Sequence, residues 1–97
     1  MIRELVTIKD KDWSINLEDE AFAEHPEELI QEAVHAVQIT AAGHYVNLVT
    51  HKSAGHPEFG LIDQLREALT ESGILNVDLV YIDECGCGGF VTRAYRL

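Results

Sequence analysis

Apolar positions recur along the chain with two periods, one typical of strands and the other of helices. Residues 13–17 alternate apolar and polar side chains, as a half-buried strand does, and residues 45–50 are rich in β-branched and aromatic side chains. Residues 77–83 are apolar on both alternating faces over their middle, a pattern that favours an interior strand over an edge strand. Residues 90–95 have the composition of a further strand. The pattern therefore predicts a strand at each of these four places.

Two segments with helical periodicity lie between these strands. The first is predicted to begin at Pro26, because proline suits the first helical position, and its apolar face is formed by Ile30, Val34, Val37 and Ala41. Gly43 is placed to terminate it. The second is predicted over residues 58–72, with Gly73 as its C-terminal cap. The acidic stretch 18–20 predicts a loop or one helical turn ahead of the first helix.

The order of elements, (β)βαβαββ, predicts an α/β fold of the α+β kind: a two-layer sandwich of two helices on a mixed four- to five-stranded sheet. Right-handed crossovers would place both helices on one sheet face, unless the direction of winding reverses. The optional strand is residues 3–8, paired antiparallel with residues 12–17 across a turn-like segment. No repeat, low-complexity tract or linker divides the sequence, so we expect a single α/β domain over residues 1–97.

The charge balance excludes some classes of partner. With 17 acidic and 7 basic residues, the chain has a formal net charge of −10. Such a charge repels phosphate backbones and anionic membrane surfaces, so we expect neither nucleic acid nor a membrane as a partner. An acidic surface usually serves solubility; a salt-adapted host or a basic partner protein is the alternative explanation.

The sequence carries no targeting signal that we recognise. The first ten residues hold no apolar run of signal-peptide length, and no segment approaches the roughly 18–20 consecutive apolar residues of a membrane span. We therefore expect a cytoplasmic protein. In a reducing compartment, cysteines are more often ligands, reactive thiols or modification sites than partners in a structural disulfide.

Both cysteines of the chain lie in the segment Cys85-Gly86-Cys87-Gly88-Gly89. Because only residues 84–89 separate the last two strands, those strands are predicted to form a hairpin whose turn is this segment. Asp83 and Glu84 should disfavour a thiolate next to them, which argues against spontaneous thiol reactivity. A disulfide between the two cysteines would need a tight ring that glycine permits but does not favour. A glycine-rich turn in which the cysteines have no role is also compatible with the pattern.

A metal site is an alternative use of the cysteines. Zinc takes thiolate and imidazole ligands, and Cys85 and Cys87 could bind it together with His51 or His56. His44 is excluded from a site shared with His51, because the two lie roughly 20 Å apart at opposite ends of an extended strand. The C-x-C spacing does not match a standard zinc finger. On this alternative the chain is a small metal-binding or redox protein with zinc as its cofactor.

Catalysis by the chain itself has the least support. Ser53 lies between His51 and His56, but the nucleophile elbow G-x-S-x-G is absent and no acid partner can be assigned. There is also no P-loop and no dinucleotide-binding fingerprint. We therefore assign no catalytic residue, and outside the zinc alternative we expect no cofactor.

The pentapeptide at 85–89 resembles the motif that names the CGCGG family of radical-SAM-modified ribosomal peptides. The segments 46–51, 55–57 and 13–14 are similar to those of the family's members, which extends the resemblance over most of the chain. The resemblance implies that the protein is a substrate rather than an enzyme. Its partner would be a radical S-adenosylmethionine (SAM) enzyme with iron–sulfur clusters of its own, acting as a maturation enzyme.

The same resemblance implies where the modification falls. Cys85 and Cys87 are the expected modified positions, and Gly86, Gly88 and Gly89 are expected to complete the modification loop. A thioether or another sulfur crosslink is the kind of product expected. Glycine suits such a loop, because it obstructs least the approach of a C–H bond to a radical.

Overall fold

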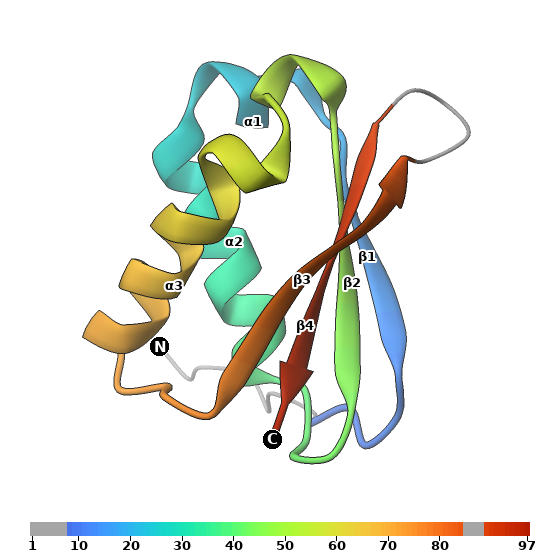
Figure 1. Ribbon diagram of the computed structural model, residues 1–97, viewed down its shortest axis with the longest axis vertical. Helices are drawn as coiled ribbons and strands as arrows, with labels where there is room; N and C mark the ends of the chain where they lie inside the picture. The colour runs from blue at the N-terminus through green and yellow to red at the C-terminus, as the bar shows by residue number, and fades with distance from the viewer. Residues whose placement is uncertain (1–7, 85–88) are drawn as a thin grey trace, which may run out of the picture.

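The structure is a computed structural model of the 97-residue chain, and it describes residues 8–84 and 89–97. Two longer helices lie on one face of a mixed sheet, so both crossovers run on the same side (Figure 1). The described elements are β1 (Trp13–Leu17), α1 (Glu20–Glu24), α2 (Pro26–Gln38), β2 (Tyr45–Thr50), η1 (Lys52–Ala54), η2 (Pro57–Phe59), α3 (Leu61–Glu71), β3 (Val77–Glu84) and β4 (Phe90–Arg96). The predicted α+β sandwich with the order βαβαββ is confirmed, with α1 as the single helical turn expected after the acidic stretch.

The sheet is built around β4. Within the described residues it has four strands in the order β1-β2-β4-β3. β1 runs parallel to β2, and β4 is antiparallel to both of its neighbours, so the last strand of the chain is inserted between β2 and β3. The predicted hairpin of β3 and β4 is confirmed by the pair Glu84 and Phe90 next to its turn.

The prediction that residues 77–83 form an interior strand is wrong, because β3 lies at the edge of the sheet. Among the described residues, helices cover only one face of the sheet. Apolar residues on both faces of a strand therefore do not mean that both faces are covered. Leu79 is buried beneath the helices, whereas Val80 and Ile82 are 38% and 39% exposed. The interior strands are β2 and β4, and β4 places the small buried side chains Thr92 and Ala94 in the protein interior.

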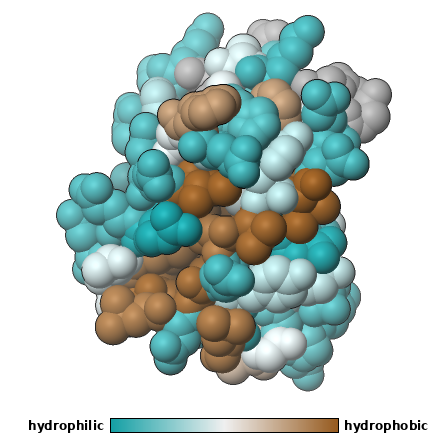
Figure 2. Space-filling view, in the orientation of Figure 1, coloured by the Kyte–Doolittle hydropathy of each residue, from teal (hydrophilic) through white to brown (hydrophobic). Residues whose placement is uncertain are grey.

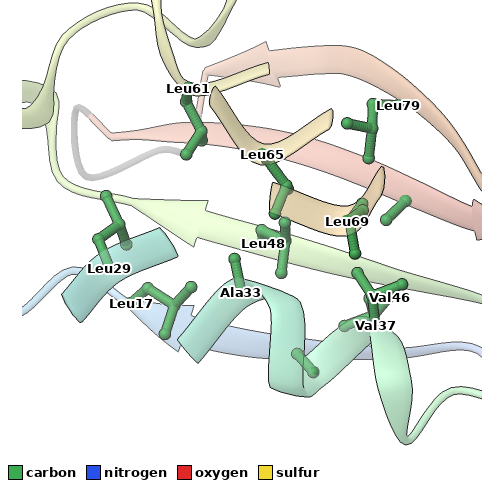
Figure 3. Packing of buried hydrophobic residues seen from close by; sticks show 12 residues of the cluster. Leu17, Leu29, Ala33, Val37, Val46, Leu48, Leu61, Leu65, Leu69 and Leu79 are labelled. Carbon is green, nitrogen blue, oxygen red and sulfur yellow. The ribbon is translucent and has the colours of Figure 1, made fainter. Parts of the chain in front are cut away.

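The core lies between the two helices and the sheet (Figure 3). It consists of leucine, valine and alanine side chains from nearly every element: Leu17, Leu29, Ala33, Ala36, Val37, Val46, Leu48, Leu61, Leu65, Leu69, Leu79 and Ala94. Each large member contributes about 1.5–3 kcal/mol when it leaves water completely. This single layer of contacts fixes the helices over the sheet, and none of the described helices lies on the opposite face.

The helix termini agree with the sequence at two of four positions. Pro26 begins α2, and Gly73, with φ 80°, closes α3 while the Ile74 N–H donates to the Leu69 carbonyl at 2.8 Å. α3 begins at Leu61, because residues 57–59 form the separate turn η2. The expected end of the first helix at Gly43 is wrong, since α2 ends at Gln38.

The early end of α2 follows from the contacts of Thr40. Lys9 pairs with Thr40 in an isolated parallel bridge, which withdraws that backbone from the helix. The Thr40 hydroxyl donates to the Ala36 carbonyl and accepts from Trp13 Nε1, both at 2.8 Å. Of the optional strand over residues 3–8, only Ile8 is described, so that prediction lies outside the described residues. Within residues 8–84 and 89–97, every helix is too short or too polar to cross a bilayer.

Thr92 provides a stability test of this arrangement. Its hydroxyl is buried and has no hydrogen-bond partner among the described residues. Thr92→Val keeps the shape of the side chain and removes an unsatisfied polar group, so we expect the free energy of unfolding to rise by about 1 kcal/mol. Thr40→Val is the matched control, because it removes a hydroxyl with two partners and should lower stability. Urea denaturation measures both changes, and a loss of stability in Thr92→Val would contradict the assignment.

Candidate functional site

The structure describes the frame on either side of the cysteine segment. The structure does not describe residues 85–88. β3 leads into the segment at Glu84, and Gly89 leads from it into β4. The base of the hairpin is thus defined, and its contacts show how the segment is attached to the fold.

Gly89 is held against the end of β2. It is buried, and a Cβ added to it would lie 2.7 Å from the Glu18 carboxylate and even closer to the backbone carbonyl oxygen of Thr50. Real Cβ atoms do not approach oxygen so closely, and the carbonyl belongs to a paired strand that cannot easily move. The Thr50 hydroxyl also donates to the Phe90 carbonyl at 3.4 Å. The last glycine of the motif is therefore a packing position within the fold.

Next to Gly89 is a group of four rings, which we call the aromatic cluster: His56, Phe59, Tyr81 and Phe90. The centroid of the His56 ring lies 4.4 Å from that of Tyr81, 5.0 Å from that of Phe90 and 5.4 Å from that of Phe59. Tyr81 and Phe90 face each other across the hairpin at 6.1 Å. Tilted and edge-on pairs of this kind are favourable beyond the area they bury. The cluster ties both strands of the hairpin to the loop before α3.

The hairpin is irregular next to this cluster. The pairing passes from Tyr81 with Thr92 directly to Asp83 with Val91, so Ile82 is an extra residue in β3. Such a bulge strengthens the local twist and changes the direction of the side chains beyond it. It therefore changes how the last residues of β3 approach the cysteine segment.

The base of the hairpin is acidic. Burial raises the pKa of the Tyr81 hydroxyl above its usual 10.0, and the negative charges of Glu84, Asp83 and Glu58 raise it further. A field that disfavours a phenolate also disfavours other anions nearby. This agrees in direction with the expectation that the acidic neighbours oppose a spontaneous thiolate in the segment.

His51 and His56 cap short helical turns. His51 Nδ1 accepts from the Ser53 N–H at 3.0 Å and lies 2.6 Å from Ser53 Oγ. His56 Nδ1 accepts from the Glu58 N–H at 3.1 Å. Each histidine precedes its turn in the sequence, but imidazole is not a usual capping group, so the role was missed. In both residues Nε2 is the nitrogen that remains for a ligand.

The predicted zinc set is not tested by these contacts, because Cys85 and Cys87 are outside the described residues. Within residues 8–84 and 89–97, the group of His, Cys, Asp and Glu side chains close enough to share an ion is His25, Glu27 and Glu28. All three are exposed and nearly adjacent in sequence, which is common without a metal. The zinc alternative therefore stays a prediction.

One feature of the uncovered sheet face was not anticipated. Arg93 lies 4.0 Å from the centre of the Tyr45 ring, and it donates to Asn47 Oδ1 at 2.8 Å and to the Tyr95 hydroxyl at 3.3 Å. Arg96 lies on the other face and donates to the Val37 carbonyl at 2.9 Å. The two arginines therefore lie on opposite faces of the sheet and do not form one basic patch.

Comparison with known proteins gives one match. The model of a family described as "Putative radical SAM target protein" matches residues 3–96, which include every described strand and helix and the cysteine segment. No curated protein and no solved structure matches the chain.

Gly89→Ala tests the packed base of the hairpin. The added methyl group would meet the Thr50 carbonyl, so we expect a loss of about 1–3 kcal/mol in the free energy of unfolding by urea. The same substitution in a Glu18→Ala background is the control, because that background removes the flexible carboxylate and keeps the backbone clash. The loss should persist there. An unchanged stability on Gly89→Ala would show that the segment is not packed against β2.

Proposed function

The chain belongs to the family of Putative radical SAM target proteins, and on that premise we propose that it is a folded substrate modified in its Cys85–Gly89 segment. The modifying partner is a radical SAM enzyme. Cys85 and Cys87 are the modified residues, and the glycines form the loop that the enzyme receives. The family match over residues 3–96 is the observation that carries this proposal.

The frame of the hairpin supports a role in presentation. A radical enzyme abstracts hydrogen from a carbon that must come close to its cofactor, so the substrate segment has to enter a closed site. In the described structure, the segment joins two paired strands whose ends are packed by Gly89 and the aromatic cluster. A firm base holds the two flanking strand ends in place while the enzyme receives the segment between them.

The acidic residues at the base of the hairpin support a reaction that the enzyme, and not the thiols alone, brings about. Asp83 and Glu84 oppose an anionic thiolate, so the sulfurs have little tendency to react unaided. A thioether bond between a cysteine sulfur and a carbon of the loop removes two hydrogens. One leaves as a hydrogen atom with the SAM-derived radical; the other leaves as a proton from the thiol, with an electron passing to an iron–sulfur cluster of the enzyme.

Coexpression with a radical SAM enzyme encoded beside this chain tests the proposal. We expect the intact mass of the purified chain to fall by two hydrogens for each crosslink, and fragmentation to locate the change within residues 85–89. Cys85→Ser and Cys87→Ser should each remove the crosslink that uses that sulfur. An unchanged mass, from an enzyme shown to cleave SAM to 5′-deoxyadenosine, contradicts the proposal.

A further inference from the structure

A shallow groove opens between the helices at one end of the molecule; most of its lining residues are apolar, and polar atoms are also exposed along it. Its volume is about 230 Å³, and α1, α2, η2 and α3 all contribute to its lining. The side chains that line it include Phe22, Leu29, Ile30, Phe59, Leu61 and Gln64. Leu29 and Leu61 belong to the core, so the groove is an opening toward the hydrophobic interior.

Phe59 is the unusual member of this groove. Its side chain is 88% exposed, the largest exposed fraction among the large hydrophobic residues described. An exposed aromatic ring beside an apolar hollow is typical of a site that a partner covers. In the space-filling view, hydrophilic side chains predominate at the upper end of the molecule and surround smaller hydrophobic areas (Figure 2).

The groove is connected to the hairpin that carries the cysteine segment. Phe59 contacts His56, which also contacts Tyr81 and Phe90 at the base of the hairpin. α1, the turns before α3 and the end of the hairpin lie at the same end of the molecule in Figure 1. A partner seated in the groove would therefore lie near the segment.

The charges of these segments indicate what kind of partner fits. Residues 20–30 and 57–65 contain no lysine or arginine, and their charged residues are Glu20, Glu24, Glu27, Glu28, Glu58 and Asp63. Glu27 and Glu28 lie between the lining residues Pro26 and Leu29, and Glu58 precedes Phe59. Negative charge thus predominates around the groove, although Asp63 pairs with Arg66 at 3.4 Å and His25 lies 3.9 Å from the carboxylates of Glu27 and Glu28. Positive potential on a partner would complement this negative charge and would speed the encounter.

The cysteine segment needs such a second contact. Three of its five residues are glycines, which offer almost no side-chain area, so the segment alone provides little binding energy. Affinity for the enzyme must then come from another surface of the fold. The groove is lined mostly by apolar residues and is linked to the hairpin base by direct ring contacts.

We propose that this groove is the docking site of the radical SAM enzyme, and that it receives an apolar segment of that enzyme flanked by basic side chains. The inference rests on the proposed function. It adds where on the fold the enzyme binds and which kinds of side chain the enzyme uses to bind there. Residues of the groove then determine how well the chain is recognised, while the cysteine segment determines what is made.

The test uses the radical SAM enzyme itself and a pair of variants at one position. Gln64 is an exposed lining residue outside the aromatic cluster, so its substitution leaves the hairpin base intact. We expect Gln64→Lys to raise the KM for the chain severalfold with kcat unchanged, and Gln64→Glu to leave KM equal or lower. Added salt should reduce the difference between the two variants.

Phe59→Ser tests the apolar part of the contact. Loss of a ring that becomes buried on docking should weaken binding about tenfold or more. Leu75→Ser is the matched control, because Leu75 is 70% exposed and lies outside the groove. It should bind as the unsubstituted chain does.

The outcomes separate this inference from the proposed function. If the unsubstituted chain is modified and all four variants match it in KM, the docking site is wrong while the proposed function stands. Equal effects of Gln64→Lys and Gln64→Glu would also overturn the charge argument. If an active enzyme leaves the unsubstituted chain unmodified, the proposed function fails, and this docking site fails with it.

Discussion

The pairing of β4 between β2 and β3 is the interaction on which the rest of the structure depends. Without it, the two strands that follow α2 and α3 would not belong to one sheet, and the helices would have no common surface to cover. The same insertion brings the start of β4 beside the end of β2. Gly89 can therefore pack against the Thr50 carbonyl, and Phe90 can reach His56.

Within this short hairpin, the residues that pack against the fold differ from those that carry the cysteines. The residues next to Cys85 and Gly88 are fixed by strand pairing, by a glycine with no room for a side chain and by tilted and edge-on ring contacts. The segment itself is rich in glycine and cysteine, which suits chemistry rather than packing. At the base of the hairpin, burial and the negative charges of Glu84, Asp83 and Glu58 raise the pKa of the Tyr81 hydroxyl. The described strands therefore fix the positions of Glu84 and Phe90, between which the cysteine segment extends.

The strands were predictable because the alternation of apolar and polar residues and the β-branched composition match the strands that the structure shows. β1 and β2 have the predicted bounds, and the hairpin follows from the short distance between its strands. The edge position of β3 was not predictable, because the apolar character of Val80 and Ile82 does not reveal which sheet face the helices cover. The end of α2 depends on a bridge between Lys9 and Thr40, residues far apart in the sequence.

The candidate site was predictable only in its chemistry. The cysteines and glycines could be recognised as a motif, and the family match agrees with that recognition. Which glycine packs against the fold could not be predicted, because the contact of Gly89 with Thr50 needs the sheet to be assembled. The aromatic cluster was missed for the same reason, since its members come from three separate parts of the chain. The capping of local turns by the Nδ1 atoms of His51 and His56 was also missed, because the sequence does not show which ring nitrogen faces the backbone.

The most direct test of the central claim compares the folded chain with its own isolated segment. A synthetic peptide of residues 81–92 contains both cysteines and all the motif glycines, but it lacks β2, the helices and the groove. The measurement is the rate at which the radical SAM enzyme modifies each substrate at equal concentration. The account predicts that the folded chain is modified and the peptide is not. Equal rates for the two would contradict the claim that the fold presents the segment.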